Sequence, residues 1–224
     1  MGLKISPVLC HPFGMRNYAY VLVDESTNLA AVVDAADAAP VIEECETLGV
    51  SPRYILTTHH HPDHTAGNEA VQNKYGAKIV CSEAEKDLIL NATIILKDGD
   101  TFQLGQSKCE VMLAKGHTEG HLLYYFRENK ALFTGDVFFN LCIGVLFEVT
   151  AEEMFESIQK IKALDDDVRF YPGHDYASFG FQFLPQDLQK EYQKEFPVLL
   201  RTEKKFNPYL QPDQLETFKK LLEG

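Results

Sequence analysis

The stretch Tyr54-Ile-Leu-Thr-Thr-His-His-His-Pro-Asp-His64 decides both the fold and the chemistry of this chain. A short apolar strand runs directly into a loop with the spacing His-x-His-x-Asp-His. Pro62 has no backbone N–H and bends the chain, so such a loop can turn several side chains towards one point. These side chains are His59, His61, Asp63 and His64. Imidazole and carboxylate are natural ligands of zinc and non-haem iron, so the loop predicts a metal site rather than a solvated histidine-rich turn.

Three further segments place a His or Asp just after a predicted strand, beside a glycine that permits a tight turn. They are residues 116–121, 134–136 and 171–176, which contain His117, His121, Asp136 and His174. Because each segment follows a strand, we expect these side chains to gather at one edge of the sheets.

Apolar alternation and turn residues indicate short strands interspersed with helices. The predicted strands are an N-terminal one and residues 18–23, 29–33, 54–56, 78–80, 101–104, 109–113, 122–126, 131–133 and 168–171. The predicted helices are 38–48, 66–75 and 152–164, and a polar, proline-interrupted helical segment begins at 179. This pattern favours sheets packed on one another and covered outside by helices.

Composition bounds the class of protein. The 224 residues include 21 Lys and Arg against 33 Asp and Glu, a net charge of −12, which disfavours nucleic acid or an anionic membrane surface as partner. We find neither a signal peptide nor an apolar run of about 18 residues. The five cysteines are odd in number and form no C-x-x-C, so we expect a reducing compartment and a cytoplasmic protein.

The ordered histidines and aspartates resemble the ligand set of the metallo-β-lactamase superfamily. The resemblance implies an α+β fold, a four-layer αβ/βα sandwich with a two-metal site at one edge. One metal would take His59, His61 and His117, and the other Asp63, His64 and His174, with Asp136 bridging them. Zinc is the expected metal, and iron or manganese would also accept these ligands.

Within the superfamily the chain is most similar to glyoxalase II, the hydroxyacylglutathione hydrolases. The matching motifs are Thr57-Thr-His-His-His-x-Asp-His-x-Ala-Gly-Asn68, Asn17-Tyr-x-Tyr20, Gly116-His-Thr-x-Gly-His121, Phe133-Thr-Gly-Asp136, Thr150-Ala-x-Glu-Met154 and Asn207-Pro-Tyr209. The resemblance implies a catalytic domain over residues 1–175 and a short helical C-terminal extension, 176–224, on the substrate side.

The implied reaction is hydrolysis of a small-molecule thioester, such as S-lactoylglutathione, by a metal-bridging hydroxide. Asp63 and Asp136 would then be catalytic as well as metal ligands. His121 and Asp34 are expected to orient the ligands, and Tyr176 matches a family tyrosine near the substrate.

Two positions depart from the family pattern. Where glyoxalase II enzymes carry a Lys and a Tyr that hold glutathione, this chain has Val145 and Phe147. Residues 138–147 are apolar, and form either a buried loop or a pocket wall for a less charged substrate. Lys204 or Lys205 could restore a positive charge from the C-terminal segment.

Several alternatives share these motifs. A persulfide dioxygenase would use one iron on His59, His117 and Asp136. A lactone or other ester hydrolase would use the full ligand set. A binding protein of the same fold is disfavoured because every ligand position is retained. The sequence leaves the oligomeric state open.

Overall fold

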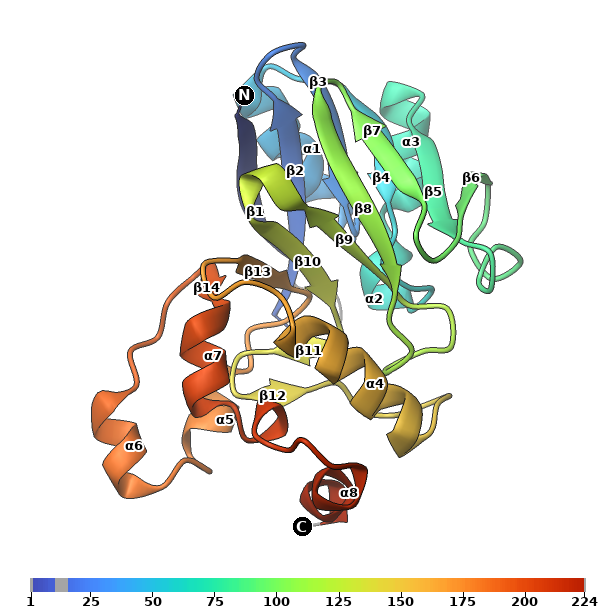
Figure 1. Cartoon of the computed structure of the whole chain (residues 1–224). Coiled ribbons are helices and arrows are strands. Elements are labelled where there is room, and N and C mark those ends of the chain that lie inside the picture. The colour runs from blue at the N-terminus through green and yellow to red at the C-terminus, as the bar shows by residue number, and fades with distance from the viewer. Residues whose placement is uncertain (1, 11–15, 224) are drawn as a thin grey trace.

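Two six-stranded sheets form the centre of the computed structural model, which describes residues 2–10 and 16–223 (Figure 1). The first sheet has the order β1-β2-β3-β4-β5-β6. In that order its strands are Leu3–Cys10, Asn17–Asp24, Leu29–Val33, Pro52–Leu56, Lys78–Ser82 and Ala92–Leu96. β1 pairs antiparallel with β2 and β2 antiparallel with β3, whereas β3, β4, β5 and β6 run parallel to one another.

The second sheet has the order β14-β13-β10-β9-β8-β7. In that order its strands are Val198–Leu199, Arg169–Pro172, Ala131–Gly135, Leu122–Phe126, Ser107–Leu113 and Thr101–Leu104. Only β10 and β13 pair in parallel among these strands. A separate hairpin pairs β11, Phe138–Phe139, with β12, Cys142–Ile143.

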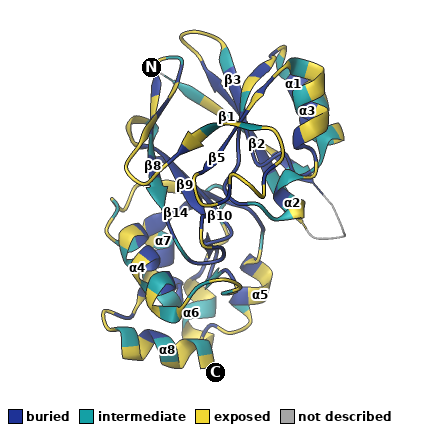
Figure 2. Ribbon diagram, turned by 90° about the vertical axis from the view of Figure 1, so that its right-hand side faces the viewer, coloured by how far each residue is buried: buried dark blue, intermediate teal, exposed yellow. Residues whose placement is uncertain are grey.

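Helices cover both outer faces of the sheets. The helices of the first half are α1 (Ala38–Leu48), α2 (Pro62–Thr65) and α3 (Asn68–Tyr75). Those of the second half are α4 (Ala151–Lys162), α5 (Ala177–Phe181), α6 (Gln186–Glu191), α7 (Leu200–Phe206) and α8 (Leu215–Glu223). Short 3-10 turns cover Arg127–Asn129 (η2) and Pro208–Leu210 (η3). Figure 2 shows the strands mostly buried and the helices exposed on one side.

The two-residue period of the strands explains the layers. In β2, Ala19, Val21 and Val23 pack towards α1 and α3, whereas Tyr20 and Leu22 pack between the sheets. In β9, the residues of Leu122–Phe126 alternate in the same way between the inter-sheet core and the core under α4 and α8. β2 and β9 are therefore apolar on both faces, as expected of strands covered on both sides.

The candidate site lies at one edge because three strands of the second sheet, β8, β10 and β13, end there. β8 and β10 are both antiparallel to β9 and so run in the same direction, and β13 is parallel to β10. Their carboxyl ends therefore lead into the loops with His117, Asp136 and His174. The start of β2 meets the last of these loops, since Asn17 forms a β-bridge with His174. That bridge brings the edge of the first sheet to the edge of the second.

The layered α+β sandwich predicted from the sequence is confirmed, and several element boundaries differ. Helix α1 has its predicted bounds, with Asp37 as N-cap and Gly49 in the left-handed conformation at its C-terminus. Helix α3 begins at Asn68 rather than at residue 66, and β6, β14 and the β11–β12 hairpin were not predicted. The segment after residue 176 contributes β14 to the second sheet, and its treatment as a separate extension remains a prediction. No helix in the described ranges is long and apolar enough to cross a membrane.

Candidate metal centre

Three imidazoles converge on one point at the edge of the sheets. Nδ1 of His61 lies 3.1 Å from Nε2 of His59 and 2.9 Å from Nε2 of His117. Burial lowers the pKa of His61 to about 4 and lowers the pKa of His117 and, strongly, of His59. All three rings are therefore neutral at physiological pH, so each can offer a nitrogen lone pair.

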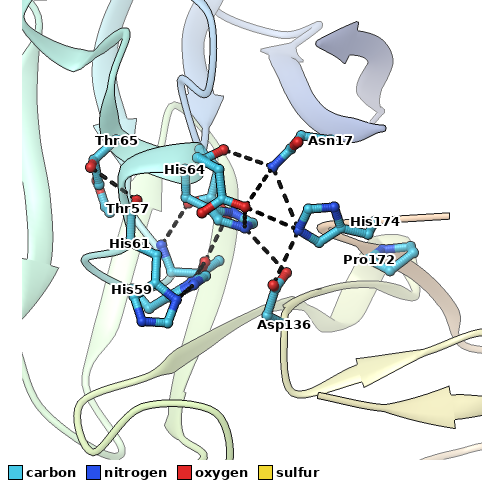
Figure 3. Close-up of polar contacts among 12 residues, drawn as sticks. Asn17, Thr57, His59, His61, His64, Thr65, Asp136, Pro172 and His174 are labelled. Carbon is cyan, nitrogen blue, oxygen red and sulfur yellow. Dashed lines mark hydrogen bonds and ion pairs between the residues drawn. The ribbon is translucent and has the colours of Figure 1, made fainter. Parts of the chain in front are cut away.

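Two more histidines and two carboxylates form an adjacent group. Nε2 of His174 lies 3.2 Å from Oδ2 of Asp136 and 3.4 Å from Oδ2 of Asp63. Nε2 of His64 lies 3.2 Å from the other carboxylate oxygen of Asp136. Asp136 also has Oδ2 at 3.7 Å from Nε2 of His117, so this carboxylate stands between the two groups. Figure 3 shows Asp136 and His174 pointing towards each other.

Charges in the second group compensate one another. Burial is the largest single effect on His174 and opposes its charge, but the charge and hydrogen bond of Asp136 and the hydrogen bond of Asp63 together outweigh it and raise the pKa of His174 to about 9. The pKa of His64 is likewise raised well above its ordinary value, against burial, by Asp136 and Asp34. Burial would raise the pKa of Asp63, yet the hydrogen bond from His174 and the charge of His64 lower it to about 2. Protonated histidines thus balance the two carboxylates.

Further side chains orient the converging groups. The Asp34 carboxylate binds Nδ1 of His64 at 3.0 Å and accepts hydrogen bonds from the backbone N–H and hydroxyl of Thr58, each at 2.7 Å. The backbone N–H of Asp136 donates to Nε2 of His121 at 3.1 Å. Nδ1 of His117 binds the carbonyl oxygen of Val145 at 2.8 Å. Such contacts fix the rotamer and tautomer of a ligand.

The backbone is packed closely against these groups at two glycines. A Cβ on Gly173 would stand 2.2 Å from Oδ1 of Asp136 and 2.6 Å from Cε1 of His64. Gly135 has a φ of +45°, and a Cβ there would stand 2.6 Å from Nε2 of His121. Only glycine leaves room for the carboxylate and the rings at these positions.

The donor sets fit divalent cations. Among the described residues, four groups bring one donor atom per residue within 4.8 Å of one another. Two of them match the predicted ligand sets, His59 with His61 and His117, and Asp63 with His64 and His174. The other two are His59 with His64 and Asp136, and His60 with His61 and Glu148. Nε2 of His64 and Oδ1 of Asp136 are buried and lie 3.2 Å from each other, and neither makes a hydrogen bond to any other atom of the described residues. Buried polar atoms are normally satisfied, so these two atoms are suited to another partner. A divalent cation would provide that partner and the positive charge now supplied by protons on His64 and His174.

Comparison with known proteins agrees with this geometry. The family model of the metallo-beta-lactamase superfamily matches residues 14–174. The hydroxyacylglutathione hydrolase of Pelagibacter ubique is 34% identical over 221 residues, which are 92% of each chain. That of a Synechococcus species is 36% identical over 228 residues, 92% of this chain and 88% of the relative. This chain belongs to the hydroxyacylglutathione hydrolase family of the metallo-beta-lactamase superfamily.

A solved structure supports the fold of this hydroxyacylglutathione hydrolase family member. The crystal structure of ETHE1 from Myxococcus xanthus superposes with a TM-score of 0.80, covering 99% of this chain and 90% of that one. The two sequences are 22% identical, so this likeness bears on the fold alone.

A cavity of about 720 Å³ opens beside the metal-binding groups of this family member. Tyr176, predicted to lie near substrate, lines it and stacks on His174 with ring centroids 5.2 Å apart. Val145 and Phe147 also line the cavity and are 62% and 65% exposed. The Phe147 ring stands 5.6 Å from that of His61 and 5.1 Å from that of His117. Residues 138–147 divide between the two interpretations. Residues 139, 142–145 and 147 form a pocket wall, whereas Phe138, Asn140 and Leu141 are buried.

The hypothesis that a C-terminal lysine supplies positive charge to this site is wrong. Nζ of Lys204 lies 2.6 Å from Oδ1 of Asp166, and Nζ of Lys205 lies 2.6 Å from Oε2 of Glu191. Neither side chain lines the cavity. Both belong to α7, whose lysines face these carboxylates rather than the metal-binding groups.

Some residues of the site were not singled out in the sequence. Asn17 donates to the backbone carbonyl of Asp63 at 2.8 Å and to its Oδ2 at 3.1 Å. The motif Asn17-Tyr-x-Tyr20, which matches the family, could have indicated that Asn17 contacts the site. Phe179 lines the cavity from α5, where only its exposed aromatic character could have indicated a function.

Proposed function

We propose that this protein hydrolyses S-2-hydroxyacylglutathione-type thioesters at a centre that binds two divalent metal ions. The relatives in its family are named hydroxyacylglutathione hydrolases, and the chain is 32–40% identical to them. The observation that carries the proposal is the pair of three-residue donor groups with Asp136 between them.

The residues would divide between the two ions as follows. The first ion is assigned to His59, His61 and His117, the second to Asp63, His64 and His174, and Asp136 would contact both. Divalent ions bound there would supply an activated water near neutral pH and polarise the substrate carbonyl. Zinc is our first choice, and iron and manganese are compatible with the same donors.

The protein's own groups would position the reactants. With a pKa of about 2, Asp63 is a carboxylate at neutral pH, so its oxygen can accept a hydrogen bond from the attacking water. The amide of Asn17 holds that carboxylate at 3.1 Å. Phe147, packed against His61 and His117, would exclude bulk water from the carbonyl. Asp34, His121 and the Val145 carbonyl would keep the ligands in place.

The second donor group argues against a mononuclear dioxygenase. A single iron on His59, His117 and Asp136 would leave Asp63, His64 and His174 without a shared partner. Those three converge within 4.8 Å, with His64 and His174 buried, which favours a second ion. An ester or lactone hydrolase would use the same donors, and differs from the main proposal only in substrate.

Metal analysis combined with thiol release from S-lactoylglutathione tests the proposal. We expect two metal ions per chain and metal-dependent hydrolysis. Asp136→Asn should lower kcat/KM by about 100-fold or more, since an outer contact alone is worth about 10- to 100-fold. The exposed Asp87→Asn serves as matched control and should behave as the parent. One iron per chain with oxygen consumption on glutathione persulfide would overturn the proposal.

A reducing compartment such as the cytoplasm belongs to the same proposal. The described cysteines Cys10, Cys45, Cys81, Cys109 and Cys142 are all free. Disulfides are rare in a reducing compartment, so five free thiols support this location.

We also propose the division into a catalytic domain, residues 1–175, and a substrate-side extension, residues 176–224. Tyr209 supports it, because this residue lines the cavity from the C-terminal segment.

A further inference from the structure

The cavity beside the metal-binding groups has an apolar interior. Apart from the ionisable side chains of that centre, its lining is aliphatic, aromatic, cysteine or glycine, and its polar side-chain groups are the Cys142 thiol and the hydroxyls of Tyr176 and Tyr209. The remaining lining residues are Pro62, Phe139, Cys142, Ile143, Gly144, Val145, Phe147, Tyr176, Phe179 and Tyr209. Cys142 adds no charge, because burial raises the pKa of its thiol to about 12. The wall therefore offers surface for apolar groups and few polar anchors.

This apolar surface extends beyond the first cavity. A second cavity of about 360 Å³ shares Ile143, Gly144, Val145 and Tyr209 with it and continues to Leu146 and Leu222. The apolar path therefore runs from the metal-binding groups to helix α8. A three-carbon hydroxyacyl group would fill only a small part of about 720 Å³, so most of this space faces the other half of the substrate.

No Lys or Arg lines either cavity among the residues that the structure describes. Nearby C-terminal lysines are held by carboxylates elsewhere: Lys194 Nζ lies 2.6 Å from Oδ2 of Asp175, and Lys204 and Lys205 pair with Asp166 and Glu191. Glutathione carries two carboxylates and would find no Lys or Arg on this wall, where Tyr176 and Tyr209 offer only uncharged hydroxyl donors. An apolar group would lose nothing by leaving water there.

We propose that the same centre also hydrolyses 2-hydroxyacyl thioesters of apolar, uncharged thiols, and that the apolar wall formed by Phe139, residues 142–145 and Phe147 favours these thioesters over the glutathione thioester. The inference rests on the proposed function, since it concerns the leaving half of the same thioester. In the reaction, water forms the new C–O bond, the C–S bond breaks, and the thiolate leaves with the electron pair and takes up a proton. No other reactant is needed.

A matched pair of thioesters tests the preference. The acyl group is lactoyl in both, and the carrier is either glutathione or phenylmethanethiol. We expect kcat/KM of the metal-loaded protein to be at least tenfold higher for the phenylmethanethiol thioester. A higher kcat/KM for S-lactoylglutathione would overturn the inference while leaving the proposed function intact. Hydrolysis of neither thioester would overturn the proposed function, and the preference with it.

A single substitution tests whether the apolar wall causes the preference for the apolar thioester. Val145→Lys places a cation in both cavities at a side chain that is 62% exposed, so folding should tolerate it. It should move the ratio of the two kcat/KM values at least tenfold towards the glutathione thioester. Leu90→Lys adds the same charge at a side chain that is 80% exposed and outside the cavities, and should leave the ratio unchanged.

Binding without catalysis provides a second readout. S-Methylglutathione has no thioester bond to hydrolyse, so it can be titrated calorimetrically into the metal-loaded protein. Its Kd should be at least tenfold lower for Val145→Lys than for the parent, and Leu90→Lys should bind it as weakly as the parent does. Equal ratios of kcat/KM and equal titrations for Val145→Lys and the parent would refute the role of the wall.

Discussion

Asp34 is a buried residue that orients the predicted metal ligand His64 without being a predicted ligand itself. Its carboxylate is 1% exposed, binds His64 Nδ1, and is held by the N–H and hydroxyl of Thr58. Its backbone is left-handed, with a φ of 52°, a conformation that Asp and Asn tolerate better than most residues. Because the Asp34 carboxylate binds Nδ1 of His64, the other ring nitrogen, Nε2, faces the carboxylates of Asp63 and Asp136. Asp34 thus acts on the site through His64.

We expect Asp34→Asn to lower metal affinity and kcat by about 10- to 100-fold. The amide keeps the shape and tolerates the left-handed backbone, but it loses the charge that stabilises the His64 N–H. Metal titration and thiol release measure the two effects, and the exposed Asp87→Asn is the control. An affinity equal to that of the parent would show that His64 needs no such acceptor.

The β11–β12 hairpin depends on a buried polar contact with α7. Oε2 of Glu203, on a side chain that is fully buried, accepts the backbone N–H of Leu141 at 2.6 Å and the amide of Asn207 at 3.0 Å. The same amide donates to the carbonyls of Phe139 and Cys142. The C-terminal segment thereby holds the turn that carries part of the cavity wall. Burial raises the pKa of Glu203 to about 7.

This raised pKa predicts a pH dependence of stability. Between pH 4.5 and about 7 the folded chain retains a proton on Glu203 that the unfolded chain releases. The free energy of unfolding therefore falls as pH rises through this window, by about 3 kcal/mol from this group. In Glu203→Gln that fall is absent, because an amide does not titrate.

Urea unfolding at pH 5 and pH 8 checks this expectation. The loss of stability between the two pH values should be smaller in Glu203→Gln than in the parent. The exposed Glu156→Gln provides a control for removing a carboxyl group. Equal losses in the parent and in Glu203→Gln would contradict a proton on Glu203 in the folded protein.

At the scale of the whole molecule, the metal-binding groups join the two sheets. His59, His61, Asp63 and His64 follow β4 of the first sheet, whereas His117, Asp136 and His174 follow β8, β10 and β13 of the second. The donor group of Asp63, His64 and His174 therefore draws on both sheets. Ions bound there would link the two sheets, which otherwise contact each other through the apolar core between them.

Removal of metal should therefore lower thermal stability. At a free metal concentration 1,000 times Kd, binding to the native state alone adds about 4 kcal/mol. For a chain of this size that corresponds to a fall in Tm of roughly 10 °C when a chelator is added. Thermal unfolding with and without EDTA measures it, and His174→Ala should show a smaller difference. An unchanged Tm in the parent would contradict a link between metal binding and the sheets.

Much of this arrangement was predictable because it depends on local rules. The spacing of His59, His61, Asp63 and His64 after a strand, and a His or Asp beside a glycine after three later strands, were sufficient to predict the edge at which they meet. The two-residue alternation of β2 and β9 shows the same rule for the layers. Two-residue strands such as β14 have no such period and were not predicted.

The layered fold, the family and the converging residues follow from the amino-acid sequence alone, since strand period and motif order are local properties of the chain. The positions of the charges around the cavity depend instead on tertiary packing. Lys204 and Lys205 are cations in sequence but face Asp166 and Glu191, and Asn17 reaches Asp63 across 46 positions. Such pairings depend on how α7 and the start of β2 pack, which side-chain type and spacing do not specify.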